Sequence, residues 1–205
     1  MRVAEVFKIG IGPSSSHTVG PMRAAAQFVA ILGERQRATA RITVDLFGSL
    51  ALTGRGHGTD RAVMLGLAGF APATVDQATI SGLPDAVAAQ HTLRLPSGVE
   101  IAFDPATDIV FHMGESLPHH PNGVRFTAFD GNGAVVHRAE YFSIGGGAVE
   151  GEGFENLRAA ENVPYPFASG RERRRRTRRH RAHQRRRRHH SGRRALLPRL
   201  HSGCR

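Results

Sequence analysis

The sequence predicts an α+β fold, in which helices pack on one face of a partly antiparallel sheet within a single domain. Apolar runs with the spacing of a helix occur beside segments that alternate apolar and polar residues, as half-buried strands do. Two tight-turn sequences, Pro96-Ser-Gly98 and Asp130-Gly-Asn-Gly133, lie between such alternating segments and predict hairpins. Regular strand–helix–strand repetition is missing, so we do not expect a doubly wound parallel sheet.

The first half of the chain predicts two helices around one strand. Residues 3–9 form a short helix or strand, and a helix then continues from His17 to about Leu32, where Gly33 stops it. Residues 40–47 alternate with the period of a strand. Residues 48–60 are a connection broken by glycines, and Thr59 or Asp60 caps the helix that follows.

The second half of the chain predicts mainly strands. Residues 71–90 form a loop and then a short alanine-rich helix near residues 85–90. The two hairpins pair residues 92–95 with 99–103 and residues 123–129 with 134–142, and residues 108–112 add another strand. Residues 148–170 are expected to be a loop with at most one helical turn.

The charge of the chain is concentrated at its C-terminus. The formal net charge is +11, but residues 171–205 contain sixteen arginines and one acidic residue, Glu172, whereas residues 1–170 are mildly acidic. As a functional arm, such a segment would bind nucleic acid through phosphates. We favour a frameshift product, since no aromatic residue interrupts the arginines and a GC-rich gene read out of frame gives such runs. We therefore expect a domain over residues 1–168, a disordered tail over 169–205, and no nucleic-acid partner.

Other features of the composition indicate a cytoplasmic protein. No apolar stretch reaches the roughly 18 residues of a membrane-spanning helix, and the N-terminus lacks the layout of a signal peptide. The single cysteine, Cys204, excludes an internal disulfide and a metal site with several cysteines.

The stretch from Gly10 to Arg23 predicts a helix start suited to an anion. Its three serines can cap the exposed N–H groups of a helix, and Pro21 needs no amide donor in the first turn. Free amides and the helix dipole attract a carboxylate or phosphate. On the pattern alone, a well-capped helix with spare serines is an equally good interpretation.

The stretch Gly10-Ile-Gly-Pro-Ser-Ser-Ser-His-Thr-Val-Gly-Pro-Met22 resembles the N-terminal signature of bacterial iron–sulfur L-serine dehydratases. The resemblance covers about residues 3–168. It continues in order through further segments, which are Phe47-Gly-Ser-Leu-Ala-Leu-Thr-Gly54, Gly56-His-Gly-Thr-Asp60, His120-Pro-Asn-Gly123, Tyr141-Phe-Ser-Ile-Gly-Gly-Gly147 and Val163-Pro-Tyr-Pro-Phe167.

The resemblance implies roles for particular residues. His57, in a glycine-framed loop, becomes the candidate acid–base group, because an imidazole exchanges a proton near neutral pH. Thr59 and Asp60 become candidates for orienting that imidazole or binding the substrate ammonium. The remaining substrate-binding candidates are Ser14, Ser15, Ser16, His17, Thr18, His120 and Asn122. Without the resemblance, a loop histidine, helix caps and an Asn-Gly turn explain the same residues.

The family converts L-serine to aminoacrylate and water, and aminoacrylate hydrolyses to pyruvate and ammonia. The resemblance implies a [4Fe–4S] cluster held by three cysteines of a helical catalytic domain, together with a homo-oligomer when the protein is complete. Cys204 aligns with no cluster position, so we expect this chain alone to bind no cluster and to be inactive. The alternative function is a regulatory module that binds L-serine or another small carboxylate without chemistry.

Overall fold

The computed structural model describes residues 11–154. The predictions for residues 3–9, for residues 155–170, and for the arginine-rich segment with Cys204 lie outside the described residues. Within residues 11–154, no helix is long and apolar enough to cross a lipid bilayer.

The described residues form a seven-stranded sheet in the order β2-β3-β1-β5-β6-β7, with β4 also paired to β1. On one side, β1 pairs in parallel with two strands in turn, with β3 at Arg41 and with β4 from Val44 to Phe47. The other pairs, β2–β3, β1–β5, β5–β6 and β6–β7, are antiparallel. The strands span Arg41–Phe47 (β1), Thr92–Arg94 (β2), Glu100–Ala102 (β3), Ile109–His112 (β4), Gly123–Phe129 (β5), Val135–Gly145 (β6) and Ala148–Gly151 (β7).

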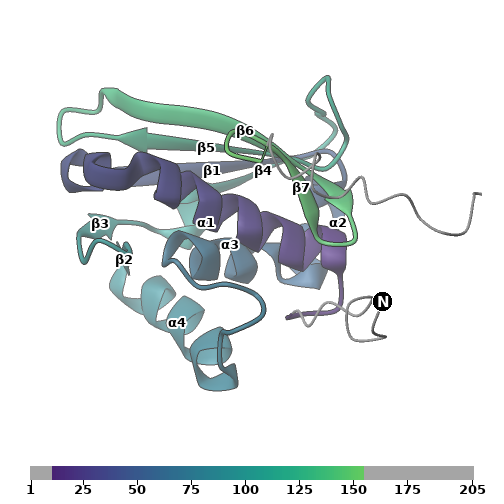
Figure 1. Ribbon diagram of the computed structural model, residues 1–205, viewed down its shortest axis with the longest axis horizontal. Helices are drawn as coiled ribbons and strands as arrows, with labels where there is room; N and C mark the ends of the chain where they lie inside the picture. The colour runs from purple at the N-terminus through teal and green to yellow at the C-terminus, as the bar shows by residue number, and fades with distance from the viewer. Residues whose placement is uncertain (1–10, 155–205) are drawn as a thin grey trace, which may run out of the picture. The chain divides into compact units, whose positions relative to one another are not determined.

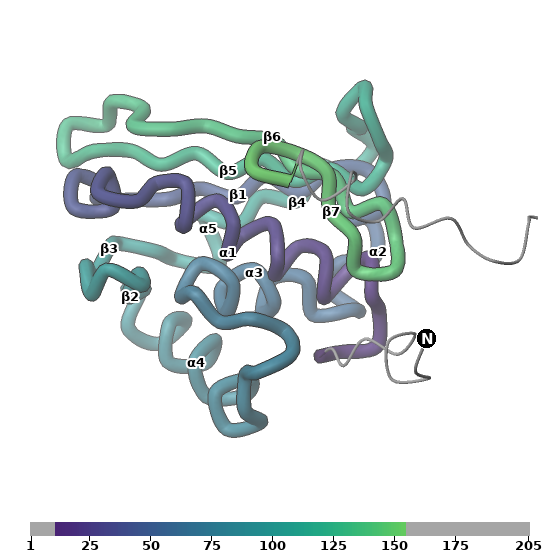
Figure 2. The backbone as a smooth tube through the Cα atoms, in the orientation of Figure 1, coloured from purple at the N-terminus to yellow at the C-terminus, as the bar shows by residue number. Residues whose placement is uncertain are grey.

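The main helices lie on one face of this sheet, and α1 lies along β5 and β6 (Figure 1). The tube view shows α4 on the side of α3 that faces away from the sheet, close to β2 (Figure 2). The helices span Gly20–Leu32 (α1), Ser49–His57 (α2), Thr59–Leu67 (α3), Gln77–Gln90 (α4) and Pro105–Asp108 (α5). A π-helical turn, Ser15–Val19 (η2), precedes α1, and a 3₁₀ turn, Gly33–Ala38 (η3), follows it. The predicted α+β architecture is confirmed.

The core fills the space between the sheet and the helices. Alternate residues of β1, which are Ile42, Val44 and Leu46, are fully buried, as the period of a strand requires. Phe28 of α1 stacks on Phe126 of β5 with ring centroids 5.2 Å apart. Burial of one such side chain contributes about 1.5–3 kcal/mol, so this face holds the sheet and helices together.

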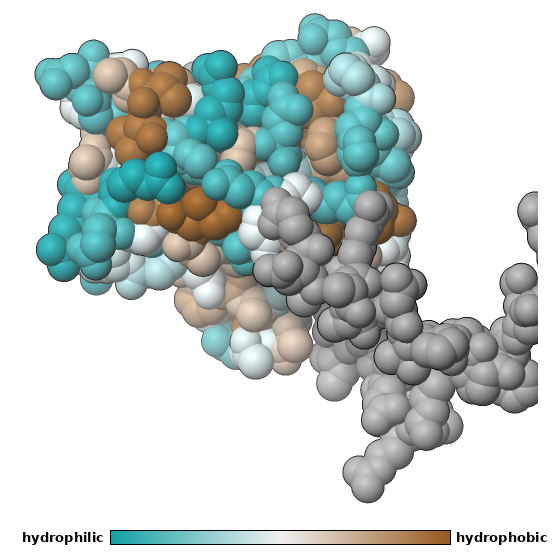
Figure 3. Space-filling model, turned by 45° about the horizontal axis from the view of Figure 1, so that its top comes forward, coloured by the Kyte–Doolittle hydropathy of each residue, from teal (hydrophilic) through white to brown (hydrophobic). Residues whose placement is uncertain are grey.

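The opposite face of the sheet carries mainly polar residues. In the space-filling view this side is mostly hydrophilic, with separate apolar patches (Figure 3). Arg125 and Glu140 form a cross-strand ion pair of 2.7 Å, and His112 Nε2 lies 2.7 Å from an Asp45 carboxylate oxygen. The ring of His112 also stacks on Phe47, with centroids 4.6 Å apart.

Both predicted hairpins, the first strand, the strand at residues 109–112 and the helix end at Leu32 are confirmed. Three expectations are wrong. Residues 49–57, predicted as a connection, form α2. The alanine-rich helix begins at Gln77 rather than near residue 85, and residues 148–151 form β7 rather than a loop.

The early start of α4 has a clear physical cause. The Asp76 side chain caps the helix by accepting from Thr79 N, at 2.9 Å, and from Thr79 Oγ1, at 2.8 Å. These bonds lower the pKa of Asp76. Pro84 lies inside the helix and is buried, so packing against α3 offsets the hydrogen bond that proline cannot make.

Candidate functional site

The candidate site lies where β1 ends and α2 begins. Gly48 joins the two elements with a φ of +54°, and a Cβ on it would lie 2.1 Å from the Pro121 carbonyl oxygen. Only glycine fits such a backbone, because other residues would be strained and would collide. Gly48 N donates to Glu115 O at 2.7 Å, and Ser49 N donates to Pro121 O at 3.0 Å. Main-chain bonds therefore fix the loop at residues 115–122 against the start of α2.

The serine-rich stretch forms the π-helical turn η2 ahead of α1. Ser14 is its N-cap, and Ser14 Oγ accepts from His17 N at 3.2 Å. The cap at the end of the turn, Gly20 N, donates to Ser15 O, five residues earlier. Pro21 has no N–H to give to the carbonyl of His17, four residues before it, and so the α-helical pattern is interrupted here.

Two threonines tie this turn to the next two helices. Thr59 Oγ1, at the start of α3, donates to His17 O at 2.6 Å, and so satisfies the carbonyl that Pro21 leaves without its helical donor. Thr18 Oγ1 donates in the other direction, to His57 O at 2.9 Å. Both threonines are buried. The pair of bonds fixes the backbones of His17 and His57 relative to each other.

The rings of His17 and His57 face each other with centroids 4.9 Å apart and an interplanar angle of 36°. His17 Nδ1 lies 2.9 Å from Ser16 Oγ, while His17 Nε2 lies 3.0 Å from Ser49 Oγ and 3.3 Å from Ser49 O. His57 Nδ1 lies 2.9 Å from Thr53 O on its own helix. Among the described residues, nothing forms a hydrogen bond with His57 Nε2.

Burial of the ring lowers the pKa of His17 below its ordinary value of 6.5. The Ser49 carbonyl opposes this shift, since it accepts a bond from the charged form, and the positive charge on His57 adds to it. The net direction keeps His17 neutral at pH 7.

His120 and Asn122 lie on the loop that contacts the start of α2. Asn122 N donates to His120 Nδ1 at 3.1 Å, and Asn122 Nδ2 donates to Ser143 O at 3.0 Å. Within residues 11–154, neither residue forms a hydrogen bond with His17 or His57. The link is indirect, through the bond from Ser49 N to Pro121 O.

The structure thus brings most of the predicted residues to one end of the sheet, and it alters several details. His57 is the last residue of α2, not a loop residue, and Gly58 caps α3 in place of Thr59 or Asp60. Asp60 accepts from Arg61 N, at 2.9 Å, and among the described residues no hydrogen bond joins it to His57. Ser15 is exposed, and its side chain makes no hydrogen bond with the described residues.

Packing explains why a glycine-rich segment is helical. A Cβ on Gly54 would lie 3.1 Å from Thr59 Oγ1 and 3.3 Å from the Phe111 ring, so glycine permits α2 to approach both α3 and β4 closely. Gly58, with a φ of +65°, then ends the helix. These contacts offset the helix propensity that each glycine lacks, about 1 kcal/mol.

Sequence reasoning missed Ser49 and Ser143. Ser49 contacts His17 Nε2. Ser143 is 1% exposed, and its hydroxyl has no hydrogen-bond partner among the described residues. That hydroxyl would lie 2.0 Å from a Cβ on Gly20, so α1 and β6 meet closely here. Both serines lie within motif segments already quoted, Phe47–Gly54 and Tyr141–Gly147, and that position was the available signal.

The residues present do not fit an iron–sulfur cluster. Such a cluster needs several thiolate ligands, whereas Cys204, the one cysteine in the sequence, lies outside the described residues. Residues 11–154 contain no group of three or more His, Cys, Asp or Glu side chains placed to hold a metal ion.

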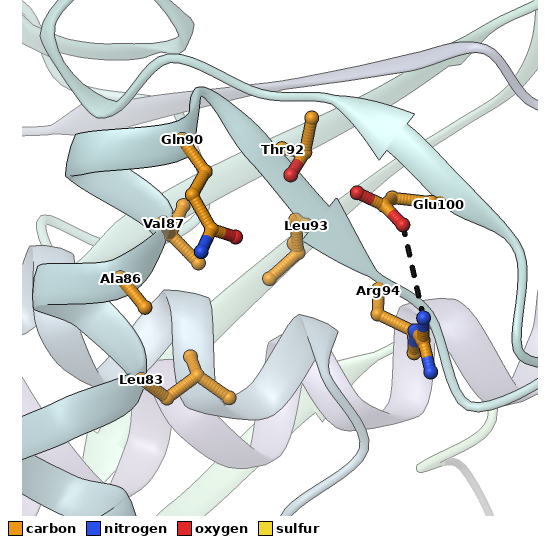
Figure 4. A pocket seen from close by; sticks show the side chains of 8 residues that line it. All are labelled: Leu83, Ala86, Val87, Gln90, Thr92, Leu93, Arg94 and Glu100. Atoms are coloured by element: carbon orange, nitrogen blue, oxygen red, sulfur yellow. Dashed lines mark ion pairs between the residues drawn. The ribbon is translucent and has the colours of Figure 1, made fainter.

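A hollow of about 270 Å³ lies between α4 and the β2–β3 hairpin, away from this site. Figure 4 shows Leu83, Val87 and Leu93 on its walls, with Arg94 and Glu100 paired across its edge at 3.8 Å. None of the predicted site residues lines this hollow. The chemistry-bearing side chains and the hollow are therefore separate features.

Comparison with known proteins decides the family. The family model for the serine dehydratase beta chain matches residues 2–153. The chain belongs to this family. The family expected from the sequence motifs is therefore confirmed.

Several bacterial relatives agree with this family assignment. L-serine dehydratase 1 of Escherichia coli is 47% identical over 173 residues, which cover 82% of this chain and 38% of the relative. The L-serine dehydratase of Streptomyces coelicolor is 43% identical over 83% of this chain and 39% of the relative. That of Mycobacterium tuberculosis is 42% identical over 83% and 38%. The chain therefore matches less than two fifths of the length of these relatives.

Proposed function

We propose that this chain supplies the substrate-binding and proton-transfer part of an L-serine dehydratase, which converts L-serine to pyruvate and ammonia. The pair of imidazoles at the end of β1 carries this proposal, because their hydrogen bonds leave one ring nitrogen free to accept a proton. The names of the relatives supply the substrate.

His57 is the proposed base. A carbonyl oxygen only accepts hydrogen bonds, so the 2.9 Å contact with Thr53 O requires the proton on Nδ1 of the neutral ring. The lone pair is then on Nε2, which forms no hydrogen bond with the described residues. Removal of the α-proton by this nitrogen and loss of the β-hydroxyl as water would leave aminoacrylate. A positioned base of this kind contributes about 10²–10⁴-fold to a rate.

The start of η2 is the proposed site for the substrate carboxylate. The amides of Ser15 and Ser16 open the turn and have no intrahelical acceptor to bond, and the hydroxyls of Ser14 and Ser16 lie beside them, 3.4 Å apart. The adjoining helix adds a favourable dipole for an anion. Thr59 is joined to this turn by its bond to His17 O, and we assign Asp60, His120 and Asn122 to the same substrate site.

A catalytic domain or chain is the proposed partner at this site. Three large apolar side chains near the site are exposed: Leu52 by 64%, Met113 by 57% and Ile144 by 41%. Their sequence neighbours include Ser49, Glu115 and Ser143, which build the site. We take these exposed side chains to be part of a surface that another protein covers. We also propose that this partner would supply the [4Fe–4S] cluster. The complete protein is proposed to form a homo-oligomer and to be located in the cytoplasm.

Complementation tests the proposal. The chain is mixed with the separately produced remainder of the Escherichia coli relative, and pyruvate release from L-serine is measured. We expect pyruvate from the mixture only. In NMR spectra of the chain, L-serine should shift the imidazole signals of His17 and His57, whereas D-serine should not. Absence of both pyruvate and shifts would contradict the proposal, whereas shifts without pyruvate would favour the regulatory module.

A further inference from the structure

We infer that Ser49 is a positioning residue, which holds His17 as the neutral imidazole protonated on Nε2 and so leaves proton transfer to His57. The inference deepens the proposed function, since the proton concerned is the one taken from L-serine. The hydrogen-bond arrangement itself can be tested without any catalysis.

The contacts of His17 define one tautomer. Nε2 lies within hydrogen-bond distance of both the hydroxyl and the carbonyl of Ser49, and the carbonyl can only accept. Nε2 therefore carries the proton. Nδ1 is then an acceptor, and Ser16 Oγ at 2.9 Å is its donor. Both ring nitrogens of His17 are thus occupied by serines of the protein.

His57 has the opposite arrangement. Its proton is on Nδ1, directed to Thr53 O within the same helix, and its Nε2 is free. Ser49 and Thr53 are one helical turn apart on α2, and Thr53 Oγ1 donates to Ser49 O at 3.0 Å. One face of α2 therefore gives two facing imidazoles opposite tautomers.

Because the two rings are close together, their opposite tautomers decide which imidazole accepts an added proton. Two imidazolium ions 4.9 Å apart would repel each other, so the pair favours a single added proton. On His17, a proton on Nδ1 would require the Ser16 hydroxyl to turn from donor to acceptor. The free position is Nε2 of His57.

Nitrogen-15 NMR of the imidazoles in the full chain tests the assignment at pH 7.5. We expect His17 in the Nε2–H form and His57 in the Nδ1–H form. In Ser49→Ala, the ratio of Nε2–H to Nδ1–H in His17 should fall roughly 2- to 10-fold, which corresponds to the loss of one hydrogen bond. The tautomer of His57 should not change, because Thr53 O remains in place.

Three further variants keep the test decisive. Ser16→Ala should shift the ratio of Nε2–H to Nδ1–H in His17 in the same direction. This variant can be measured even if Ser49→Ala does not fold. Ser49→Thr retains the hydroxyl and should restore the ratio. Ser81→Ala is the matched control, since the Ser81 hydroxyl bonds only to carbonyls of its own helix.

The outcomes separate this inference from the proposed function. An Nδ1–H tautomer of His17 in the unchanged chain, or a ratio that a folded Ser49→Ala variant does not alter, would overturn the role of Ser49. Addition of L-serine to the same samples addresses the proposed function. Tautomers as expected without any response to L-serine would leave the role of Ser49 in fixing His17 intact and would contradict the substrate.

Discussion

The end of β1 and the hollow beside α4 differ in how their polar groups are held. At the end of β1, side chains of η2 and α3 donate to main-chain carbonyls of α2 and η2, and the donors, Thr18 and Thr59, are buried. At the hollow, Arg94 and Glu100 come from one hairpin, are mostly exposed and lie 3.8 Å apart. Convergence of several elements on half-buried polar groups indicates a site here, whereas an open hollow alone does not.

The largest expected effect is on catalysis, through His57. In the complemented enzyme, His57→Gln should reduce pyruvate release about 10²- to 10⁴-fold, because the variant lacks the proposed base. The fold should persist, since Thr18 bonds to the backbone oxygen of this residue and not to its ring. The measurement is kcat beside the thermal unfolding midpoint. An unchanged kcat in His57→Gln would contradict the assignment of the reaction to the end of β1.

Thr59→Val should reduce the free energy of unfolding by about 1–3 kcal/mol, because the buried carbonyl of His17 loses its side-chain donor. Urea denaturation measures this change. Thr74→Val is the matched control, since Thr74 is exposed and its hydroxyl lies 3.5 Å from its acceptor. Equal decreases in the free energy of unfolding of the two variants would show that the Thr59–His17 bond does not stabilise the fold more than an exposed hydroxyl does.

The stability of the site region should depend on pH through His17. Its pKa in the folded chain is below the 6.5 of the unfolded chain, so the unfolded chain binds more protons as the pH falls. The contribution of the neutral ring is complete above pH 6.5 and is lost as the pH falls from there toward the folded pKa. Unfolding midpoints of the chain and of His17→Gln between pH 5 and 8 check this. The unchanged chain should lose more stability in acid, and parallel curves would contradict the shift.

The smallest effect is expected at the hollow. Arg94→Ala should change the free energy of unfolding by about 0–1 kcal/mol, because exposed ion pairs contribute little. It should leave the L-serine response of His17 and His57 unaltered. A lost response would mean that the hollow, and not the end of β1, binds the substrate.

Most of the fold could be predicted from the sequence because local signals agree with it. Alternation marks β1, and the turns at Pro96–Gly98 and Asp130–Gly133 mark the hairpins. Helix α2 could not be predicted in this way, since the reason for its glycines is the close approach of Gly54 to Thr59 and Phe111. Such contacts arise only when distant segments meet.

The site was predictable in its residue types but not in its connections. The motifs single out His17 and His57 as candidate site residues, yet the serine that contacts His17 comes from α2, 32 residues away. The link between Pro21, which lacks an N–H, and the Thr59 hydroxyl is also a tertiary effect. Local patterns contain no information on either pairing.

The glycine at position 48 has a consequence for altering this protein. Gly48, Ser49 and Asn122 are placed by main-chain bonds to Glu115, Pro121 and Ser143. This part of the frame rests on main-chain bonds, whereas η2 is joined to α2 and α3 through the side chains of Thr18 and Thr59. A designer seeking a different substrate can exchange residues such as exposed Ser15 freely, and should leave the glycine untouched.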